Sequence, residues 1–219
     1  VLMTKLTVYD FDKTIYNGET LSNFYKFYLR KKPLKFFTSF LQLYYFILYI
    51  LKIISLEKLK EKFLQFLNGE NIENLKKYIE EFWNENENKI NSWVQNEISE
   101  NKKVTELLIA VSASPTFLIQ DKLKKMGFDL VIGTDFLFEG EKFHSKILSK
   151  NCKNEEKVKR LNEWAKTNKI DYEIVNFYSD SIADKPLFDI AKNKFWINKG
   201  KIENGMPMKK TILDKIFWK

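Results

Sequence analysis

One short segment near the start of the chain constrains its fold more than any other. An apolar run from Leu6 to Tyr9 predicts a buried strand, and two aspartates, Asp10 and Asp12, follow where that strand ends. In an extended chain, residues i and i+2 share a face, so the two carboxylates point the same way. Carboxylates this close repel each other unless a cation or a shared proton relieves them. The segment therefore predicts a site for a hard cation such as Mg²⁺, and Thr14 follows where an anion could lie. The alternative, from this segment alone, is an ordinary aspartate-rich turn.

Two further apolar runs, 108–111 and 174–178, also predict buried strands that end in polar side chains. In open parallel sheets, ligands bind at the carboxyl ends of the strands. We therefore expect the polar groups around these strand ends to form one site that binds phosphate or metal. These groups are Ser112, Ala113, Lys157, Asp180 and Asp184.

The rest of the chain predicts the α/β class, with a Rossmann-like parallel sheet flanked by helices. Predicted helices over 116–126 and 155–169 alternate with predicted strands over 128–132 and 194–197, and such alternation is typical of a parallel sheet. A hairpin is predicted around Gly140. The chain has 219 residues, of which 44% are hydrophobic, enough for one core with a smaller insert.

Together, these motifs resemble the haloacid dehalogenase superfamily of phosphohydrolases. The resemblance rests on the segment from Asp10 to Thr14, on Ser112, on Lys157, and on Asp180 with Asp184, in that order along the chain. It implies a phosphomonoester substrate and a core formed by residues 1–17 and 102–219. The helical segment 18–101 is then a small cap domain inserted between the first two motifs.

The resemblance also implies a role for each catalytic residue. Asp10 is the nucleophile that forms an aspartyl-phosphate, and Asp12 is the general acid and then the general base. Mg²⁺ is held by Asp10, the main-chain carbonyl of Asp12, and Asp180. Lys157 binds the phosphoryl oxygens, and Lys153 is the alternative for that role.

Four further residues are assigned to the substrate side of the same site. Ser112 and the amide of Ala113 bind phosphoryl oxygens, while Asp184 orients Lys157 or a metal-bound water. Glu19 lies nine residues beyond Asp10, at the spacing of a cap carboxylate in phosphoserine phosphatases. Ser114 is expected to cap the helix that begins after Pro115.

The predicted insert contains an unusual apolar run. From Phe36 to Leu51 no charged residue occurs, whereas the remainder of the insert up to about Glu100 has amphipathic helical patterns. Three interpretations of the run remain open: a buried cap helix, an interfacial helix on a bilayer, and a membrane span. The run is borderline in length for a span, which needs about 20 apolar residues.

Two branches of the superfamily fit the insert differently. Phosphoserine phosphatases need a cap arginine for the substrate carboxylate, and Arg30 is the only arginine of the insert. The bacterial phosphatidylglycerophosphatase C type resembles the chain more closely, at residues 27–34 with the apolar run, at 152–158 and at 178–187. That resemblance implies a lipid phosphate substrate and peripheral contact with an anionic membrane. A soluble metabolite phosphatase and a non-enzymatic membrane-binding scaffold are the alternatives.

Composition excludes several other classes. The single histidine, His144, and the single cysteine, Cys152, leave no zinc cluster and no intramolecular disulfide. The net charge of +8 favours anionic partners, but the chain has no compact Lys/Arg tract or nucleic-acid motif. No signal peptide is expected, which favours the cytoplasm, either free or associated with the inner face of the cell membrane. The oligomeric state is left open.

Overall fold

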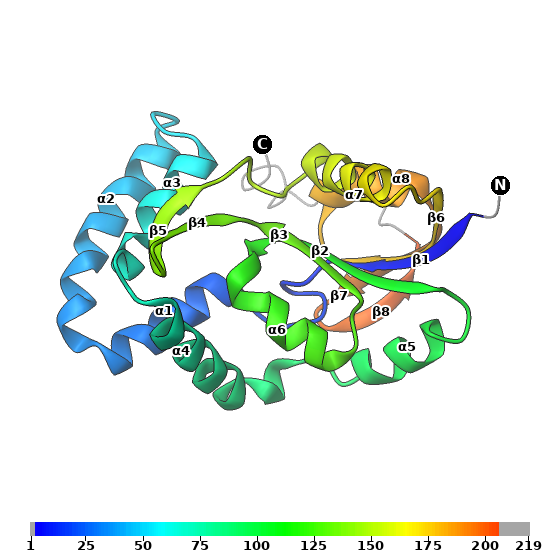
Figure 1. Ribbon diagram of the computed structural model, residues 1–219, viewed down its shortest axis with the longest axis horizontal. Coiled ribbons are helices and arrows are strands. Elements are labelled where there is room, and N and C mark those ends of the chain that lie inside the picture. The colour runs from blue at the N-terminus through cyan, green and yellow to red at the C-terminus, as the bar shows by residue number, and fades with distance from the viewer. Residues whose placement is uncertain (1–2, 206–219) are drawn as a thin grey trace.

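The fold is built on one six-stranded sheet in the computed structural model, which describes residues 3–205 (Figure 1). The strand order is β3–β2–β1–β6–β7–β8, and neighbouring strands are parallel except in the antiparallel β7–β8 pair. This arrangement confirms the predicted α/β class. The strands of the sheet are β1 (Thr4–Tyr9), β2 (Leu107–Pro115), β3 (Leu130–Thr134), β6 (Tyr172–Ser179), β7 (Ala191–Asn198) and β8 (Lys201–Asn204).

Helices cover both faces of this sheet because its central strands are apolar on both sides. Leu6 and Val8 of β1 pack in one cluster with Leu161 of α7 (Glu155–Thr167) and Leu187 of α8 (Lys185–Ile190). Tyr9 belongs to the cluster on the opposite face, together with residues of α5 (Val94–Asn101) and α6 (Thr116–Met126). The alternation follows from the two-residue period of a strand. Figure 1 shows α7 and α8 above the sheet and α5 and α6 below it.

The predicted insert between β1 and β2 is helical. Apart from α5, its elements are α1 (Thr20–Lys31), η1 (Pro33–Phe37), α2 (Thr38–Ile50), α3 (Leu56–Phe63), η2 (Leu64–Leu67), α4 (Ile72–Glu85) and η3 (Glu87–Lys89), where η marks a 3-10 helix. Ser55 and Asn71 cap α3 and α4, each accepting a hydrogen bond from a main-chain N–H of the first turn. Pro33 follows the end of α1, where its ring is incompatible with a continued helix.

Aromatic side chains of the insert pack together within the larger hydrophobic cluster on the α5 and α6 face of the sheet. Phe24, Phe27, Tyr28, Phe66 and Phe82 are fully or almost fully buried and contact one another at edge-to-face, tilted or stacked angles. Such aromatic contacts add about 0.5–1.5 kcal/mol each beyond the area they bury. The helices α1 and α4 and the η2 turn are therefore fixed against one another.

A hairpin from the core half of the chain joins the insert to the sheet. The hairpin consists of β4 (Phe136–Glu139) and β5 (Lys142–Ile147), and the predicted turn at Gly140 lies between them. Main-chain hydrogen bonds connect its Phe143 with Gly69 and Glu70 of the insert. Trp83 of α4 adds a second connection, since its Nε1 donates to the main-chain oxygen of Leu118 in α6 at 2.8 Å.

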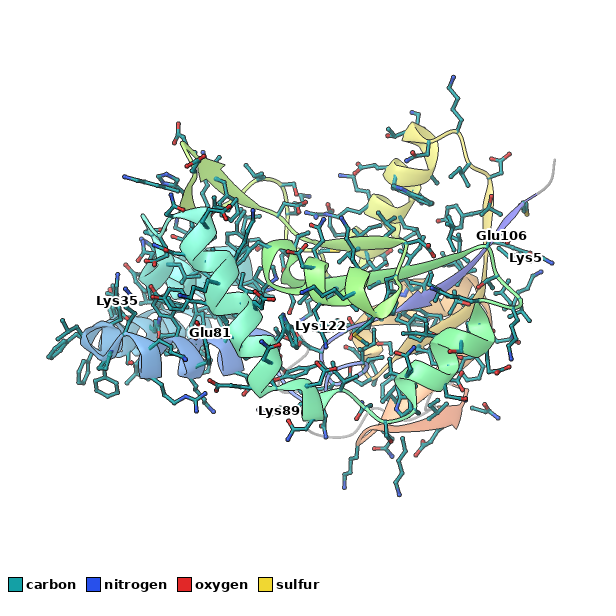
Figure 2. The ribbon with its side chains drawn as sticks, turned by 60° about the horizontal axis from the view of Figure 1, so that its bottom comes forward. Lys5, Lys35, Glu81, Lys89, Glu106 and Lys122 are labelled. Carbon is teal, nitrogen blue, oxygen red and sulfur yellow. The ribbon has the colours of Figure 1, made fainter. Side chains whose placement is uncertain are left out.

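The helix α2 is exposed along most of its length. The interpretation of this run as a buried cap helix is therefore wrong, since Gln42 is the one buried residue of α2. No helix within residues 3–205 is both long enough and apolar enough to cross a membrane. In Figure 2, Lys35 of η1, the element that precedes α2, lies at one end of the molecule, and Lys5 and Glu106 lie at the other. We call the exposed apolar side chains of this region the apolar patch: Leu34, Phe36, Phe37, Phe40, Leu41, Leu43, Tyr44, Phe46, Ile47, Ile50, Leu51 and Ile53.

Candidate active site

The predicted site residues meet at the carboxyl edge of the sheet, where β1, β2 and β6 lie side by side. A cavity of about 250 Å³ opens there between the sheet and the insert. The sequence-predicted residues that line it are Asp10, Asp12, Glu19, Ser112, Ala113, Lys157, Asp180 and Asp184. Of the predicted set, Thr14 alone is absent from the lining, and both lysine candidates, Lys153 and Lys157, are in it.

Lys157 lies between two buried carboxylates. Its Nζ is 2.7 Å from Asp10 Oδ1 and 2.8 Å from Asp184 Oδ2, and its side chain is only 3% exposed. Burial lowers the pKa of this amine, but the ion pairs with Asp10 and Asp184 outweigh that effect and raise it. Lys157 therefore stays charged and fixes the orientation of Asp10. The lysine reaches the site from the first turn of α7.

The negative charge of Asp10, Asp180 and Asp184 exceeds the positive charge that Lys157 provides among them. Burial raises the pKa of Asp10; Lys157 opposes this shift, and the charges of Asp184 and Asp180 add to it. Burial and Asp184 likewise raise the pKa of Asp180, against the lowering effect of Lys13. A divalent cation between Asp10 and Asp180 would relieve this repulsion, so the donor set fits Mg²⁺.

A cation bound here would have few side-chain ligands. No three His, Cys, Asp or Glu side chains are grouped as metal ligands in the part of the chain that the structure describes. A metal would thus have two carboxylates, Asp10 and Asp180, and would need main-chain oxygen and water for its other ligands. Main-chain oxygens and waters are ordinary ligands for Mg²⁺, which retains several waters in protein sites.

Thr14 lies beneath the site rather than in its wall. Its hydroxyl is 3.4 Å from both Asp10 Oδ2 and Asp180 Oδ1, and it accepts a hydrogen bond from the main-chain N–H of Asp180 at 3.1 Å. The side chain is fully buried. In this geometry Thr14 holds two carboxylates in place and has no open path to an anion.

Asp12 is held by hydroxyl and amide donors instead of by a lysine. Its Oδ1 accepts hydrogen bonds from the main-chain N–H of Thr20 at 2.8 Å and from the Thr20 hydroxyl. Its Oδ2 accepts a hydrogen bond from the Ser114 hydroxyl at 2.5 Å. Burial raises the pKa of Asp12, and these donors partly counter that shift by favouring the ionised form.

The prediction that Ser114 caps a helix is wrong. The residue before α6 is Pro115, and no side chain caps that helix. The hydroxyl of Ser114 is directed to Asp12 instead, across the cavity from β2 to the end of β1. The adjacent Ser112 accepts a hydrogen bond from the Ser114 N–H at 3.1 Å.

Ser179 belongs to the same hydrogen-bonded network. Its hydroxyl donates to Asp184 Oδ2 at 2.7 Å and accepts from the Ser181 N–H at 3.0 Å. It therefore supports the carboxylate that also holds Lys157. Ser179 directly precedes Asp180, so the end of β6 supplies both a buried support and a cavity-lining carboxylate.

The cavity also has a lysine that the sequence did not single out. Lys60 extends from α3 of the insert, and its Nζ donates to the Ala113 main-chain oxygen at 2.7 Å and to Asn151 Oδ1 at 2.6 Å. Burial lowers the pKa of Lys60 to about 8, although Asp12 acts in the opposite direction. Among the many lysines of the chain, only the fold distinguishes this one.

Glu19 lies at the rim of the cavity, paired with Lys13. The two side chains are 2.5 Å apart and about half exposed. Lys13 has a φ of 57°, a left-handed conformation that a glycine adopts without cost. Both Lys13 and Glu19 line the cavity.

Comparison with known proteins places this geometry in a family. A profile of haloacid dehalogenase-like hydrolases matches residues 7–189. A solved protein of unknown function from Bordetella pertussis Tohama I has a TM-score of 0.78 at 20% identity, with 88% of this chain and 89% of that chain covered. A phospho-aspartyl intermediate analogue of phosphoserine phosphatase has a TM-score of 0.60 at 19% identity, over 88% and 86% of the two chains.

A third solved structure has a similar fold at a lower sequence identity. A HAD-family hydrolase from Salmonella enterica subsp. enterica serovar Typhi has a TM-score of 0.62 at 12% identity, over 87% of this chain and 61% of that one. No curated protein matches the chain. At these identities the structural similarities show a shared fold.

Proposed function

We propose that this chain, which belongs to the haloacid dehalogenase-like hydrolase family, hydrolyses phosphomonoesters through a covalent intermediate on Asp10. The observation that carries the proposal is the cavity in which Asp10, Asp12, Lys157 and Asp180 converge. A carboxylate nucleophile, a second carboxylate for proton transfer and a fixed cation are the parts that such a reaction needs. The insert 18–101 serves as the cap over this cavity.

The reaction proceeds in two displacements at phosphorus. In the first, an oxygen of Asp10 bonds to phosphorus while the bond to the leaving alkoxide breaks, and Asp12 donates a proton to that alkoxide. In the second, Asp12 accepts a proton from water, the water oxygen bonds to phosphorus, and the bond to Asp10 breaks. The products are an alcohol and inorganic phosphate, and both aspartates return to their initial states.

Other residues orient these groups and balance their charge. Lys157 holds Asp10 and offsets its charge, with Asp184 and Ser179 behind it. Thr14 positions Asp10 relative to Asp180. Ser112 and the Ala113 amide are proposed to bind the phosphoryl oxygens. Mg²⁺ held by Asp10, Asp180 and the Asp12 carbonyl would neutralise the phosphate charge that the carboxylates otherwise repel.

We propose that the substrate is a lipid phosphate such as phosphatidylglycerol phosphate, presented at an anionic membrane. The outward surface of α2 supports this, because its polarity is reversed relative to an ordinary surface helix. Polar side chains face inward: Gln42 Nε2 donates to the Phe63 main-chain oxygen at 3.0 Å, and the Ser39 hydroxyl is 2.6 Å from that of Tyr25. The apolar patch faces outward, as in a helix that lies on a bilayer.

A soluble substrate such as phosphoserine is the second candidate. The similarity in fold to phosphoserine phosphatases and the position of Glu19 at the rim favour it. The position of Arg30 counts against it. Its guanidinium is 2.7 Å from Glu85 Oε2, its side chain is 66% exposed, and it does not line the cavity. A carboxylate-binding arginine from the insert is therefore missing from the described site.

The test compares a lipid phosphate with phosphoserine and with a generic aryl phosphate. We expect hydrolysis of all phosphomonoesters to require Mg²⁺ and to stop with a chelator, and the lipid phosphate to have the highest kcat/KM. Hydrolysis that is indifferent to the chelator would contradict the metal assignment. A higher kcat/KM for phosphoserine than for any lipid phosphate would contradict the lipid assignment and leave the phosphatase assignment intact.

A further inference from the structure

An apolar groove begins next to the catalytic cavity. It lies between α1, α2 and α3 and has a volume of about 330 Å³. Its walls include Leu21 from α1, Leu43 and Phe46 from α2, and Leu59 and Phe63 from α3. Leu43 and Phe46 are themselves about half exposed, so the groove leaves apolar surface uncovered.

The groove and the catalytic cavity adjoin each other. Leu21, Ser22 and Lys60 line both. Lys60 is at the junction, where its Nζ is bonded to the core through Ala113 and Asn151 while its aliphatic chain borders the groove. A ligand bound across this junction would place an anionic group near the Lys60 ammonium and an apolar group along the methylenes of the same side chain.

We propose that this groove binds the alkyl chain of the phosphomonoester substrate while its phosphate occupies the catalytic cavity. The inference rests on the proposed phosphatase function and adds a site for the apolar part of the substrate. Three observations select this occupant: the lining residues shared with the cavity, the apolar walls, and the position of Leu43 and Phe46 in the apolar patch. A chain leaving a bilayer at the patch would enter the groove past Leu43 and Phe46, which belong to both surfaces.

The experiment uses alkylphosphonates, which carry the phosphorus dianion but have no ester bond to cleave. Propyl, hexyl and octyl phosphonate are titrated into the full chain by calorimetry with Mg²⁺ present, below their micelle concentrations and without lipid. A fully buried methylene corresponds to at most about a fourfold gain in affinity. We expect affinity to rise on the order of twofold or more for each methylene, until the groove is filled.

Two adjacent and similarly exposed residues of α2 give a matched pair of variants. Leu43 is 57% exposed and lines the groove, whereas Tyr44 is 54% exposed and does not. Leu43→Asp should remove most of the dependence on chain length, and Tyr44→Asp should preserve it. Both variants should unfold at temperatures close to that of the unaltered protein, because each change is on the surface.

The outcomes are separable from those of the proposed function. Equal affinity for the three phosphonates, or an equal response to Leu43→Asp and Tyr44→Asp, would overturn the groove assignment. A dimer in sedimentation that Leu43→Asp converts to monomer, with no dependence on chain length, would make the groove a self-association surface instead. Chain-length dependence that Leu43→Asp removes, in a protein that hydrolyses no phosphomonoester, would support the groove and overturn the phosphatase proposal.

Discussion

The two aspartates at the end of β1 have different surroundings, and those surroundings favour different roles. Asp10 faces the buried ammonium of Lys157, whereas Asp12 is held by hydroxyl and amide donors from Thr20 and Ser114. A carboxylate fixed by a permanent cation suits nucleophilic attack. A carboxylate with hydrogen-bond donors and no ion pair can exchange a proton during the reaction.

Asp12→Asn should slow both displacements, because the amide can neither protonate the leaving alkoxide nor accept a proton from water. Losses of about 10²–10⁴ in rate are typical when general acid–base catalysis is removed. Rapid-quench kinetics with an alkyl phosphate measures the two steps separately. An aryl phosphate is the control, since its leaving group needs less protonation and its first step should suffer less. A near-normal rate with the alkyl phosphate would contradict the role given to Asp12.

Lys157→Met should destabilise the protein as well as impair catalysis. It leaves Asp10 and Asp184 buried without their cation, a kind of change that typically costs about 3–5 kcal/mol. The matched control is Lys185→Met, which removes an exposed ion pair with Asp189 and should cost about 0–1 kcal/mol. Urea unfolding at neutral pH measures both. Equal free energies of unfolding for the two variants would show that Lys157 does not balance the buried charges of Asp10 and Asp184.

At the scale of elements, α3 connects the insert to the edge of the sheet where the candidate site lies. Its Lys60 donates to Ala113 of β2 and to Asn151, and the β5 strand adds the Ile147 N–H, which donates to Glu61 Oε1 at 3.1 Å. These contacts set the position of the groove wall relative to the cavity. A substitution at Lys60 therefore affects both the groove and the cavity.

The stabilising effect of Lys60 should depend on pH. Its pKa is lowered to about 8 by burial, so between about pH 8 and 10.5 the folded protein binds fewer protons at this site than the unfolded chain. Stability therefore rises with pH across that window, by at most roughly 3 kcal/mol. Thermal unfolding of the unaltered protein and of Lys60→Met across this range isolates the effect. A stability difference that stays constant or falls with rising pH would contradict it.

The sequence contained enough information to predict which residues meet at the edge of the sheet, but not the groove. Asp10, Ser112 and Asp180 follow apolar runs, and the rule that parallel strands end at one edge brings them together. Lys60 and Ser114 lie in segments with ordinary local patterns, and their hydrogen-bond partners are about 50 to 100 positions away in the chain. Only the packed structure reveals such contacts. Strand β8 was also not predicted, because its four residues have little hydrophobic pattern.

At the scale of the whole molecule, charge and apolar surface combine at one end. The chain has a net charge of +8, and the apolar patch is flanked by Lys32, Lys35 and Lys52 in the segments next to α2. An exposed apolar area of this extent usually marks an interaction surface. Basic residues near an anionic bilayer each add on the order of 1 kcal/mol of attraction.

Binding to anionic vesicles should accordingly have two components. The electrostatic component, measured by vesicle sedimentation, should weaken as salt rises, since exposed charges are screened. The component from burial of apolar side chains should persist as residual binding at high salt. Tyr44→Asp should reduce both the total and the residual, because it places a charge in the apolar patch. Tyr45, by contrast, is half-buried beneath Lys62, so it is a poorer site for this test. Tyr44→Asp should leave hydrolysis of a small soluble phosphomonoester nearly unaltered. If the unaltered protein does not bind anionic vesicles at low salt, the proposed contact with the membrane is wrong.

The most direct test of the central claim is to locate the phosphoryl group during turnover. The protein is mixed with a phosphomonoester and Mg²⁺, quenched in acid within one turnover, and digested for peptide mass mapping. We predict one phosphoryl group on Asp10 in the unaltered protein. We predict none in Asp10→Asn, which should remain folded and lose nearly all turnover, whereas the exposed control Asp189→Asn should behave as the unaltered protein does. Sustained turnover in Asp10→Asn, or a phosphoryl group on another residue, would contradict the account.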